Sequence, residues 1–117
     1  DAGSLIISPA DKELVDPHDA WADDKTLATG VESFQGVINA PIDRMLSNWA
    51  GLRSFAPDGN LVIGPDKNNP SFFWFAGQGG YGFQTASAAS QLLSDLFLER
   101  KVSVESETLL ALLPGRF

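Results

Sequence analysis

The sequence predicts an α+β fold in which helices accompany a small set of antiparallel strands. Two stretches carry apolar residues at helical spacing, and two others show the alternation or the continuous apolar character of strands. A strong turn signal, Pro57-Asp58-Gly59, lies between two predicted strands and favours a hairpin. The length of 117 residues suits one domain, and a hydrophobic fraction of 44% is typical of a globular chain.

The N-terminal part is predicted to contain a short strand, an acidic loop and a helix. The strand is expected at residues 4–8 and the loop at 9–23. The helix begins at Asp23 or Asp24, because either carboxylate can cap it and complement its dipole. Pro41 lies beyond its end. Its apolar face is formed by Leu27, Val31, Phe34 and Ile38.

The central part alternates with a period of two. Residues 44–56 are therefore predicted to be a strand, with Trp49, Gly51 and Arg53 on one face. After the turn, residues 61–63 return as the expected hairpin partner of this strand.

The C-terminal part is predicted to contain a buried strand and a second helix. Residues 72–76 are continuously apolar, which indicates a strand covered on both faces. A glycine-rich segment at 77–82 leads into a helix that ends near Glu99, and a short helix is expected at 107–113. The apolar face of the second helix is formed by Ala86, Ala89, Leu92, Leu93, Leu96 and Phe97.

Charge and composition exclude several functions. The net charge is −7, and residues 1–24 hold seven acids and one base. This balance excludes binding to nucleic acid through phosphate contacts and disfavours binding to an anionic membrane. The chain has no cysteine, so disulfides and thiolate chemistry are excluded. It begins at Asp1, so we expect a mature product, a cleaved piece or an excised part of a longer protein.

The strongest chemical signal is the segment Gly77-Gln78-Gly79-Gly80-Tyr81-Gly82, which matches a GxGxxG pattern. No second strand with a terminal acid follows it, so a Rossmann unit is disfavoured. Two interpretations remain. The segment is a turn that needs positive φ, or it is a loop whose N–H groups and following helix end contact a flat or anionic ligand.

A second candidate is Arg53, whose guanidinium is suited to bidentate capture of a carboxylate. The alternative is a surface arginine that pairs with an acid or stacks on Trp49. His18 is the only histidine and lies in the acidic loop, where a solvated side chain is the simpler interpretation. The Asp and Asn residues near 58–69 match no EF-hand spacing, and turn chemistry explains them.

Several motifs together resemble the C-terminal part of FAD-dependent oxidoreductases of the D-amino-acid oxidase family, which includes glycine oxidases and sarcosine oxidases. The resemblance covers most of the chain and is strongest from Asp43 to Arg100. Its motifs are Trp49-Ala50-Gly51-Leu52-Arg53, Pro57-Asp58-Gly59, Ile63-Gly64-Pro65, the segment from Phe75 to Gln84, and the ending Pro114-Gly115-Arg116-Phe117.

The resemblance implies a fragment of a two-domain flavoprotein. Residues 1–56 would belong to the substrate-binding domain, with its antiparallel strands. Residues 57–117 would supply a hairpin, a strand, the loop that faces the flavin and a C-terminal helix that returns to the FAD-binding domain. The family's dinucleotide fingerprint lies near the N-terminus and is absent here. The isolated chain would therefore be inactive without the missing N-terminal part of the protein.

The resemblance also implies residue roles. Arg53 would hold the substrate carboxylate, and Tyr81 would line the flavin or the substrate entrance. Gly51 stands where covalent members carry a flavin-linked cysteine, so FAD would be held non-covalently. Gln84 stands where sarcosine oxidases have a lysine, which argues against a sarcosine-type substrate. The residues expected at the cofactor are Gly51, Gly77, Gln78, Gly79, Gly80, Tyr81, Gly82, Phe83 and Gln84.

The implied reaction is oxidation of the C–N bond of an amino acid or secondary amine, with hydride transfer to FAD, in the cytoplasm. Two alternatives from other classes remain. One is a self-contained module that binds small anions through Arg53 and the glycine-rich segment. The other is a non-catalytic interaction domain that uses the aromatic residues at 72–75.

Overall fold

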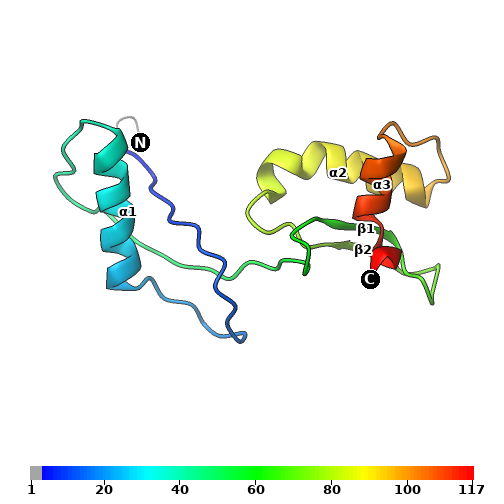
Figure 1. The fold of residues 1–117 in the computed structure, drawn as a ribbon, viewed down its shortest axis with the longest axis horizontal. Helices are drawn as coiled ribbons and strands as arrows, with labels where there is room; N and C mark the ends of the chain where they lie inside the picture. The colour runs from blue at the N-terminus through cyan, green and yellow to red at the C-terminus, as the bar shows by residue number, and fades with distance from the viewer. Residues whose placement is uncertain (1–3) are drawn as a thin grey trace. The chain divides into compact units, whose positions relative to one another are not determined.

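The computed structural model describes residues 4–117, which fall into two compact units (Figure 1). The first unit ends at Leu52, and the second comprises Arg53–Phe117. The first contains the helix α1, and the second contains a two-stranded sheet, two α-helices and a short 3₁₀ turn. None of the helices within residues 4–117 has both the length and the apolar character needed to cross a membrane.

The helix of the first unit, α1, spans Asp24–Val37 and begins as the sequence predicts. The carboxylate of Asp23 accepts hydrogen bonds from the amides of Lys25 at 3.1 Å and Thr26 at 3.0 Å. These bonds, led by those to Thr26, hold the pKa of the Asp23 carboxyl below its usual range. The helix packs at Gly30, where an added Cβ would lie 3.0 Å from the ring of Pro9.

The two strands predicted for the N-terminal half are wrong. Residues 4–8 and 44–56 contain no strand in the structure, so Trp49, Gly51 and Arg53 do not share a strand face. A strand persists only when its backbone N–H and C=O groups pair with a neighbouring strand. Within the described part of the first unit no strand is available as a partner, and alternation of side chains alone does not supply those bonds.

The sheet of the second unit is an antiparallel hairpin. Strand β1 spans Val62–Pro65 and β2 spans Phe73–Ala76, with Val62 opposite Ala76 and Pro65 opposite Phe73. The predicted pairing of residues 61–63 with residues 44–56 is therefore wrong, because β1 pairs with β2. The predicted turn at 57–59 is confirmed: the amide of Gly59 donates to the carbonyl of Ala56 at 2.9 Å.

Strand β2 is less covered than its apolar sequence suggests. Trp74 is 39% exposed and Phe75 is 41% exposed, whereas Phe73 and Ala76 are half-buried. The prediction that this strand is covered on both faces is wrong for this chain. A two-stranded sheet has only edge strands, and it offers too little neighbouring structure to bury every side chain of β2.

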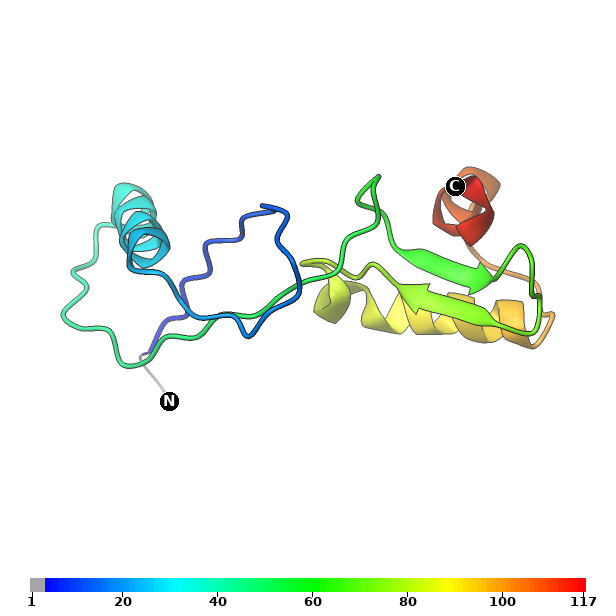
Figure 2. The same cartoon turned by 90° about the horizontal axis from the view of Figure 1, so that it is seen from below.

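The helices of the second unit build its core against β1. Helix α2 spans Gly82–Phe97 and lies along the hairpin, and α3 spans Ser106–Leu112 before the 3₁₀ turn η1 at Pro114–Arg116 (Figure 2). Ile63 of β1 is 1% exposed, the lowest value among the buried core residues. The core around it comprises Ala89 and Leu92, with Leu61, Leu93, Leu96, Val102, Val104, Leu109 and Leu112 packed against them.

Candidate functional site

The glycine-rich loop at residues 77–82 joins β2 to α2 and needs glycine at two positions. Gly77 has φ +73° and Gly79 has φ +51°, which is the left-handed region that favours glycine. Gly77 is also buried, and an added Cβ would lie 3.2 Å from the carbonyl oxygen of Asn60. The loop therefore follows a path that side chains at these positions would obstruct.

The segment that contains Arg53 packs directly against this loop. The amide of Gly79 donates to the carbonyl of Ser54 at 3.0 Å. The ring of Phe55 fills the space beside Gly79, since an added Cβ there would lie 2.7 Å from Phe55 Cδ1. An added Cβ at Gly80 would lie 2.9 Å from Arg53 Nη1. The structure thus brings together two candidates that are more than twenty residues apart in the sequence.

The guanidinium of Arg53 is positioned partly by an aromatic ring. Its Cζ lies 5.7 Å from the centroid of the Phe55 ring, which is within the range of a cation–π contact. Arg53 remains exposed at the surface of the second unit. The Phe55 ring lies on one side of the guanidinium and Gly80 on the other, so the guanidinium lies close to the backbone of the loop.

The end of α2 that begins at the loop carries no side-chain cap. Tyr81 occupies the N-cap position without a capping hydrogen bond, and the first turn holds no acid. Among the described residues, no protein acceptor is recorded for the amides of Gly80, Gly82 and Phe83. Such amides, with the helix dipole, form a region of positive potential that favours an anionic group. Helix α1, in contrast, is capped by Asp23 and has Asp24 in its first turn.

The remaining predicted site residues lie at or near the same loop, with one exception. Tyr81 is 40% exposed, Phe83 is 101% exposed, and Gln84 is exposed in the first turn of α2. Gln78 packs against Gly82, with its Cβ 3.2 Å from an added Cβ there. Gly51 belongs to the first unit, and its role beside a flavin stays a prediction.

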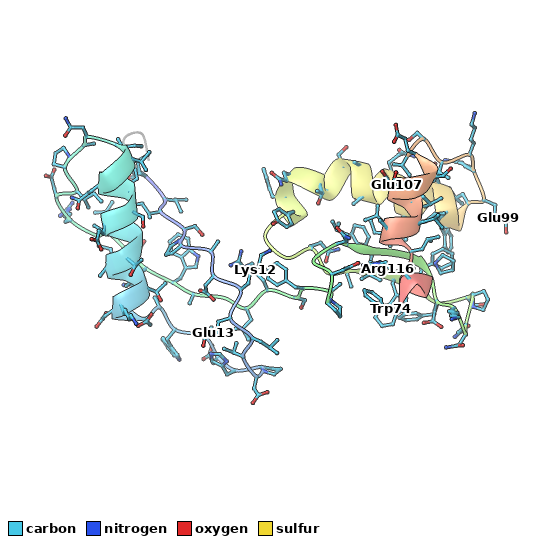
Figure 3. The ribbon with its side chains drawn as sticks, viewed as in Figure 1. Lys12, Glu13, Trp74, Glu99, Glu107 and Arg116 are labelled. Carbon is cyan, nitrogen blue, oxygen red and sulfur yellow. The ribbon has the colours of Figure 1, made fainter. Side chains whose placement is uncertain are left out.

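The weaker candidates, His18 and the Asp and Asn residues near 58–69, form hydrogen bonds with residues close to them in the sequence. His18 Nδ1 lies 2.7 Å from the carbonyl oxygen of Asp16 in an exposed loop. Trp74, which is labelled in Figure 3, donates from its indole Nε1 to the carboxylate of Asp66 at 2.9 Å. Asp66 also accepts from the amides of Asn68 and Asn69. These bonds, the indole bond above all, lower the pKa of the Asp66 carboxyl. In residues 4–117 no group of three or more metal-binding side chains comes together.

Sequence reasoning missed Phe55 and the ion pair between Asp58 and Arg116. Arg116 Nε lies 2.7 Å from Asp58 Oδ2, and its Nη2 lies 3.0 Å from Oδ1. Asp58 was visible as a turn residue and Arg116 as part of the C-terminal ending, but no pattern joins residues 58 positions apart. A bulky residue beside a glycine of the loop leaves no signal in the sequence either.

Comparison with known proteins places the sequence in a family. A family model described as FAD dependent oxidoreductase matches residues 1–96 of the chain. A curated relative, the D-amino acid dehydrogenase of Sinorhizobium medicae (strain WSM419), is 35% identical over 63 residues. That alignment covers 54% of this chain and 15% of the relative, so the chain spans a small part of the relative's length. Because the family model covers most of its residues, the chain belongs to the family of FAD-dependent oxidoreductases.

Proposed function

We propose that this chain forms the flavin-facing loop and part of the substrate site of an oxidoreductase that oxidises the C–N bond of an amino acid or secondary amine. The observation that carries the proposal is the position of Arg53 Nη1 against Gly80, beside the uncapped start of α2. The name of the relative, a D-amino acid dehydrogenase, favours an amino acid over an amine without a carboxylate.

The residues of the loop fit a flavin. A ring system that gains negative charge on reduction is stabilised by N–H donors and by a helix N-terminus. The loop offers the amides of Gly80, Gly82 and Phe83, and its glycines allow the backbone to approach a flat ligand closely. The residues that would hold FAD are those from Gly77 to Gln84. The absence of cysteine from the chain supports non-covalent binding by this segment.

The proposed division of labour assigns positioning and electrostatics to the protein. When bound, FAD supplies the two-electron acceptor that takes the hydride from the carbon next to the nitrogen. Arg53 binds the substrate carboxylate through its two-pronged guanidinium, and Phe55 restricts the movement of that side chain. The resulting imine is hydrolysed by water. No acid or base of this segment is assigned a proton transfer.

The place of the chain within the whole protein is part of the same proposal. Residues 1–56 belong to the substrate-binding domain, and residues 57–117 return the chain to the FAD-binding domain. The dinucleotide fingerprint that binds the pyrophosphate lies elsewhere, so the isolated chain is inactive. The proposed location is the cytoplasm.

The role of Arg53 is tested by Arg53→Ala in the complete protein loaded with FAD. The KM for an amino acid should rise roughly 30-fold or more, because truncating one partner of a desolvated charge pair typically costs about 2–5 kcal/mol. The KM for the corresponding amine without a carboxylate should stay within about twofold, because that amine has no group for Arg53 to bind. Steady-state kinetics on the two substrates measure both values.

Arg44→Ala is the matched control, because Arg44 is an exposed arginine of the first unit. It should leave both KM values unchanged. Equal KM values for the amino acid in wild type and Arg53→Ala would remove Arg53 from the substrate site.

The alternative is a small-anion binding module without redox chemistry, which the same arginine and uncapped amides support. It predicts calorimetric binding of carboxylates or phosphate to this chain without flavin. A non-catalytic interaction domain is supported by the exposed Trp74 and Phe75. A rise in the KM for the amino acid in Arg53→Ala, with the KM for the amine unchanged, favours the oxidoreductase over both.

A further inference from the structure

The C-terminal end of the chain is tied to the turn that follows Arg53 and Phe55. The guanidinium of Arg116 makes a bidentate pair with Asp58 and also donates from Nη1 to the carbonyl of Leu113 at 3.0 Å. Its Nη2 lies 3.4 Å from the carbonyl oxygen of Asn60. The Arg116 side chain, which is labelled in Figure 3, is only 13% exposed, so these four hydrogen bonds are largely shielded from solvent at the arginine.

The C-terminal segment has a second anchor on β1. Gly64 has φ +132°, and an added Cβ there would lie 2.8 Å from Leu113 Cδ2 and 3.5 Å from Pro114 Cδ. The segment at residues 113–114 therefore packs onto the backbone of β1. This packing of residues 113–114 on β1 fixes where Arg116 lies relative to the turn at residues 56–60.

The turn at residues 56–60 is closed by its own hydrogen bonds and lies against the glycine-rich loop. Asp58 Oδ1 accepts from the amide of Asn60 at 3.1 Å, and Gly59 donates to Ala56. The same turn forms one wall around Gly77, whose added Cβ would lie 3.2 Å from the Asn60 carbonyl oxygen and 3.6 Å from the Ala56 amide nitrogen. Any displacement of the turn moves the atoms on which the first residue of the loop rests.

These contacts form one continuous path from the C-terminus to the loop. Arg116 holds Asp58, Asp58 closes the turn on Asn60, and Asn60 lies against Gly77. From the same turn the chain runs back to Phe55 and Ser54, which contact Gly79. The segment at 53–60 thus contacts the loop at Gly77 and Gly79, and Arg116 holds this segment at Asp58.

We propose that Arg116 is a positioning residue, which sets the conformation of the glycine-rich loop through Asp58 and the turn at residues 56–60. The consequence for a bound flavin rests on the proposed function, in which this loop faces the flavin. Arg116 makes no contact with the loop itself among the bonds recorded for it, so it acts through the turn. The C-terminal segment therefore serves the loop as well as the stability of the unit.

The first test uses the chain itself, without flavin, and nuclear magnetic resonance of its backbone amides. In Arg116→Gln, the amide signals of Gly77 and Gly79 should shift. Their hydrogen exchange should be faster by roughly two- to fivefold, the range that a partly exposed ion pair supports. Asp58→Asn should produce the same pattern. The double variant should be no worse than either single variant, because both remove one shared interaction.

Arg116→Lys and Arg100→Gln complete the comparison. Lysine keeps the charge but loses the bidentate fork, so Arg116→Lys should restore only part of the wild-type exchange rates. Arg100 is an exposed arginine of the same unit, and Arg100→Gln should leave the loop unchanged. Unchanged Gly77 and Gly79 signals in Arg116→Gln, or equal acceleration at every amide of β1, β2 and α2, would overturn the proposal.

The second test uses the complete protein with FAD and measures the flavin midpoint potential and absorption spectrum. Arg116→Gln should shift both, while the KM for substrate stays at the wild-type value. If the loop amides respond to Arg116→Gln but the flavin does not, the positioning role is supported and the proposed flavin-facing function of the loop is contradicted. The amide signals therefore test the positioning role of Arg116, and the flavin measurements separately test the proposed function of the loop.

Discussion

At the scale of single residues, the loop depends on the absence of side chains at particular positions. Gly79 shows this most clearly, because it combines φ +51° with the ring of Phe55 in the place that its Cβ would occupy. The same absence lets the Gly79 amide reach the Ser54 carbonyl. A glycine in this context is required by contact as well as by backbone conformation.

Gly79→Ala should therefore destabilise the second unit. The left-handed backbone disfavours alanine by about 1 kcal/mol, and displacement of a packed ring adds about 1–3 kcal/mol. Chemical denaturation followed by tryptophan fluorescence measures the change in the free energy of unfolding. Gly115→Ala is the control, because no atom lies within 4 Å of a Cβ added there. Equal stability of the two variants would contradict the packing of Phe55 against the loop.

At the scale of elements, the two longer helices begin in opposite ways. Asp23 caps α1 with two hydrogen bonds, whereas α2 begins at the glycine-rich loop without a capping side chain. A cap stabilises a helix by satisfying its first amides, and an uncapped end keeps those amides available to a ligand. The first arrangement serves the fold, and the second suits the proposed site.

The cap of α1 makes a prediction about stability and pH. Asp23→Ala should reduce the helicity of the chain and lower its thermal midpoint, because the amides of Lys25 and Thr26 lose their acceptor. The pKa of Asp23 is lowered in the folded state, so its stabilising effect is complete above the unfolded pKa of about 4. The effect is lost as the pH falls through the lower folded pKa.

Circular dichroism between neutral and acidic pH measures this effect. The difference between wild type and Asp23→Ala should be largest near neutral pH and should disappear in strong acid. Asp19→Ala, an exposed substitution in the preceding loop, should match wild type throughout. A difference between wild type and Asp23→Ala that grows on acidification would contradict the capping role.

At the scale of the whole molecule, the core is small for the number of apolar side chains. Among the described residues the buried apolar side chains are Ile63, Ala89 and Leu92, while Trp49, Trp74 and many other large apolar side chains are exposed. Exposed apolar surface of this extent is typical of a surface that another part of a protein covers. The alignment with the D-amino acid dehydrogenase covers 15% of that relative's length.

The small core makes the second unit sensitive to Ile63. Ile63→Ala should cost about 2–5 kcal/mol of its stability, and Ile63→Val about 1 kcal/mol, because removed methyl groups leave a cavity. Leu110→Ala is the control, since Leu110 is 65% exposed. Denaturant titration measures all three. A cost for Ile63→Ala no greater than that for Leu110→Ala would contradict the assignment of Ile63 to the core.

The elements that could be predicted from the sequence are those specified by neighbouring residues. Asp23 marks the start of α1, Gly59 and Asp58 form the turn, and the apolar spacing from Ala89 to Leu96 places α2. The strands predicted at 4–8 and 44–56 failed, because a period of two describes side chains and not hydrogen-bond partners. The proximity of Arg53 to Gly80 could be expected only from the family resemblance, since nothing local encodes it.

Residue types within a few positions of one another suffice to specify the helices, the turn and the glycine-rich loop, and the composition alone excludes thiol chemistry. Three contacts between distant segments become apparent only in the folded chain: β1 pairs with β2, Phe55 packs against Gly79, and Arg116 forms an ion pair with Asp58. These contacts depend on which distant segments bury each other's surfaces and form hydrogen bonds with each other. Alternative pairings of these segments differ in free energy only when the whole folded chain is considered.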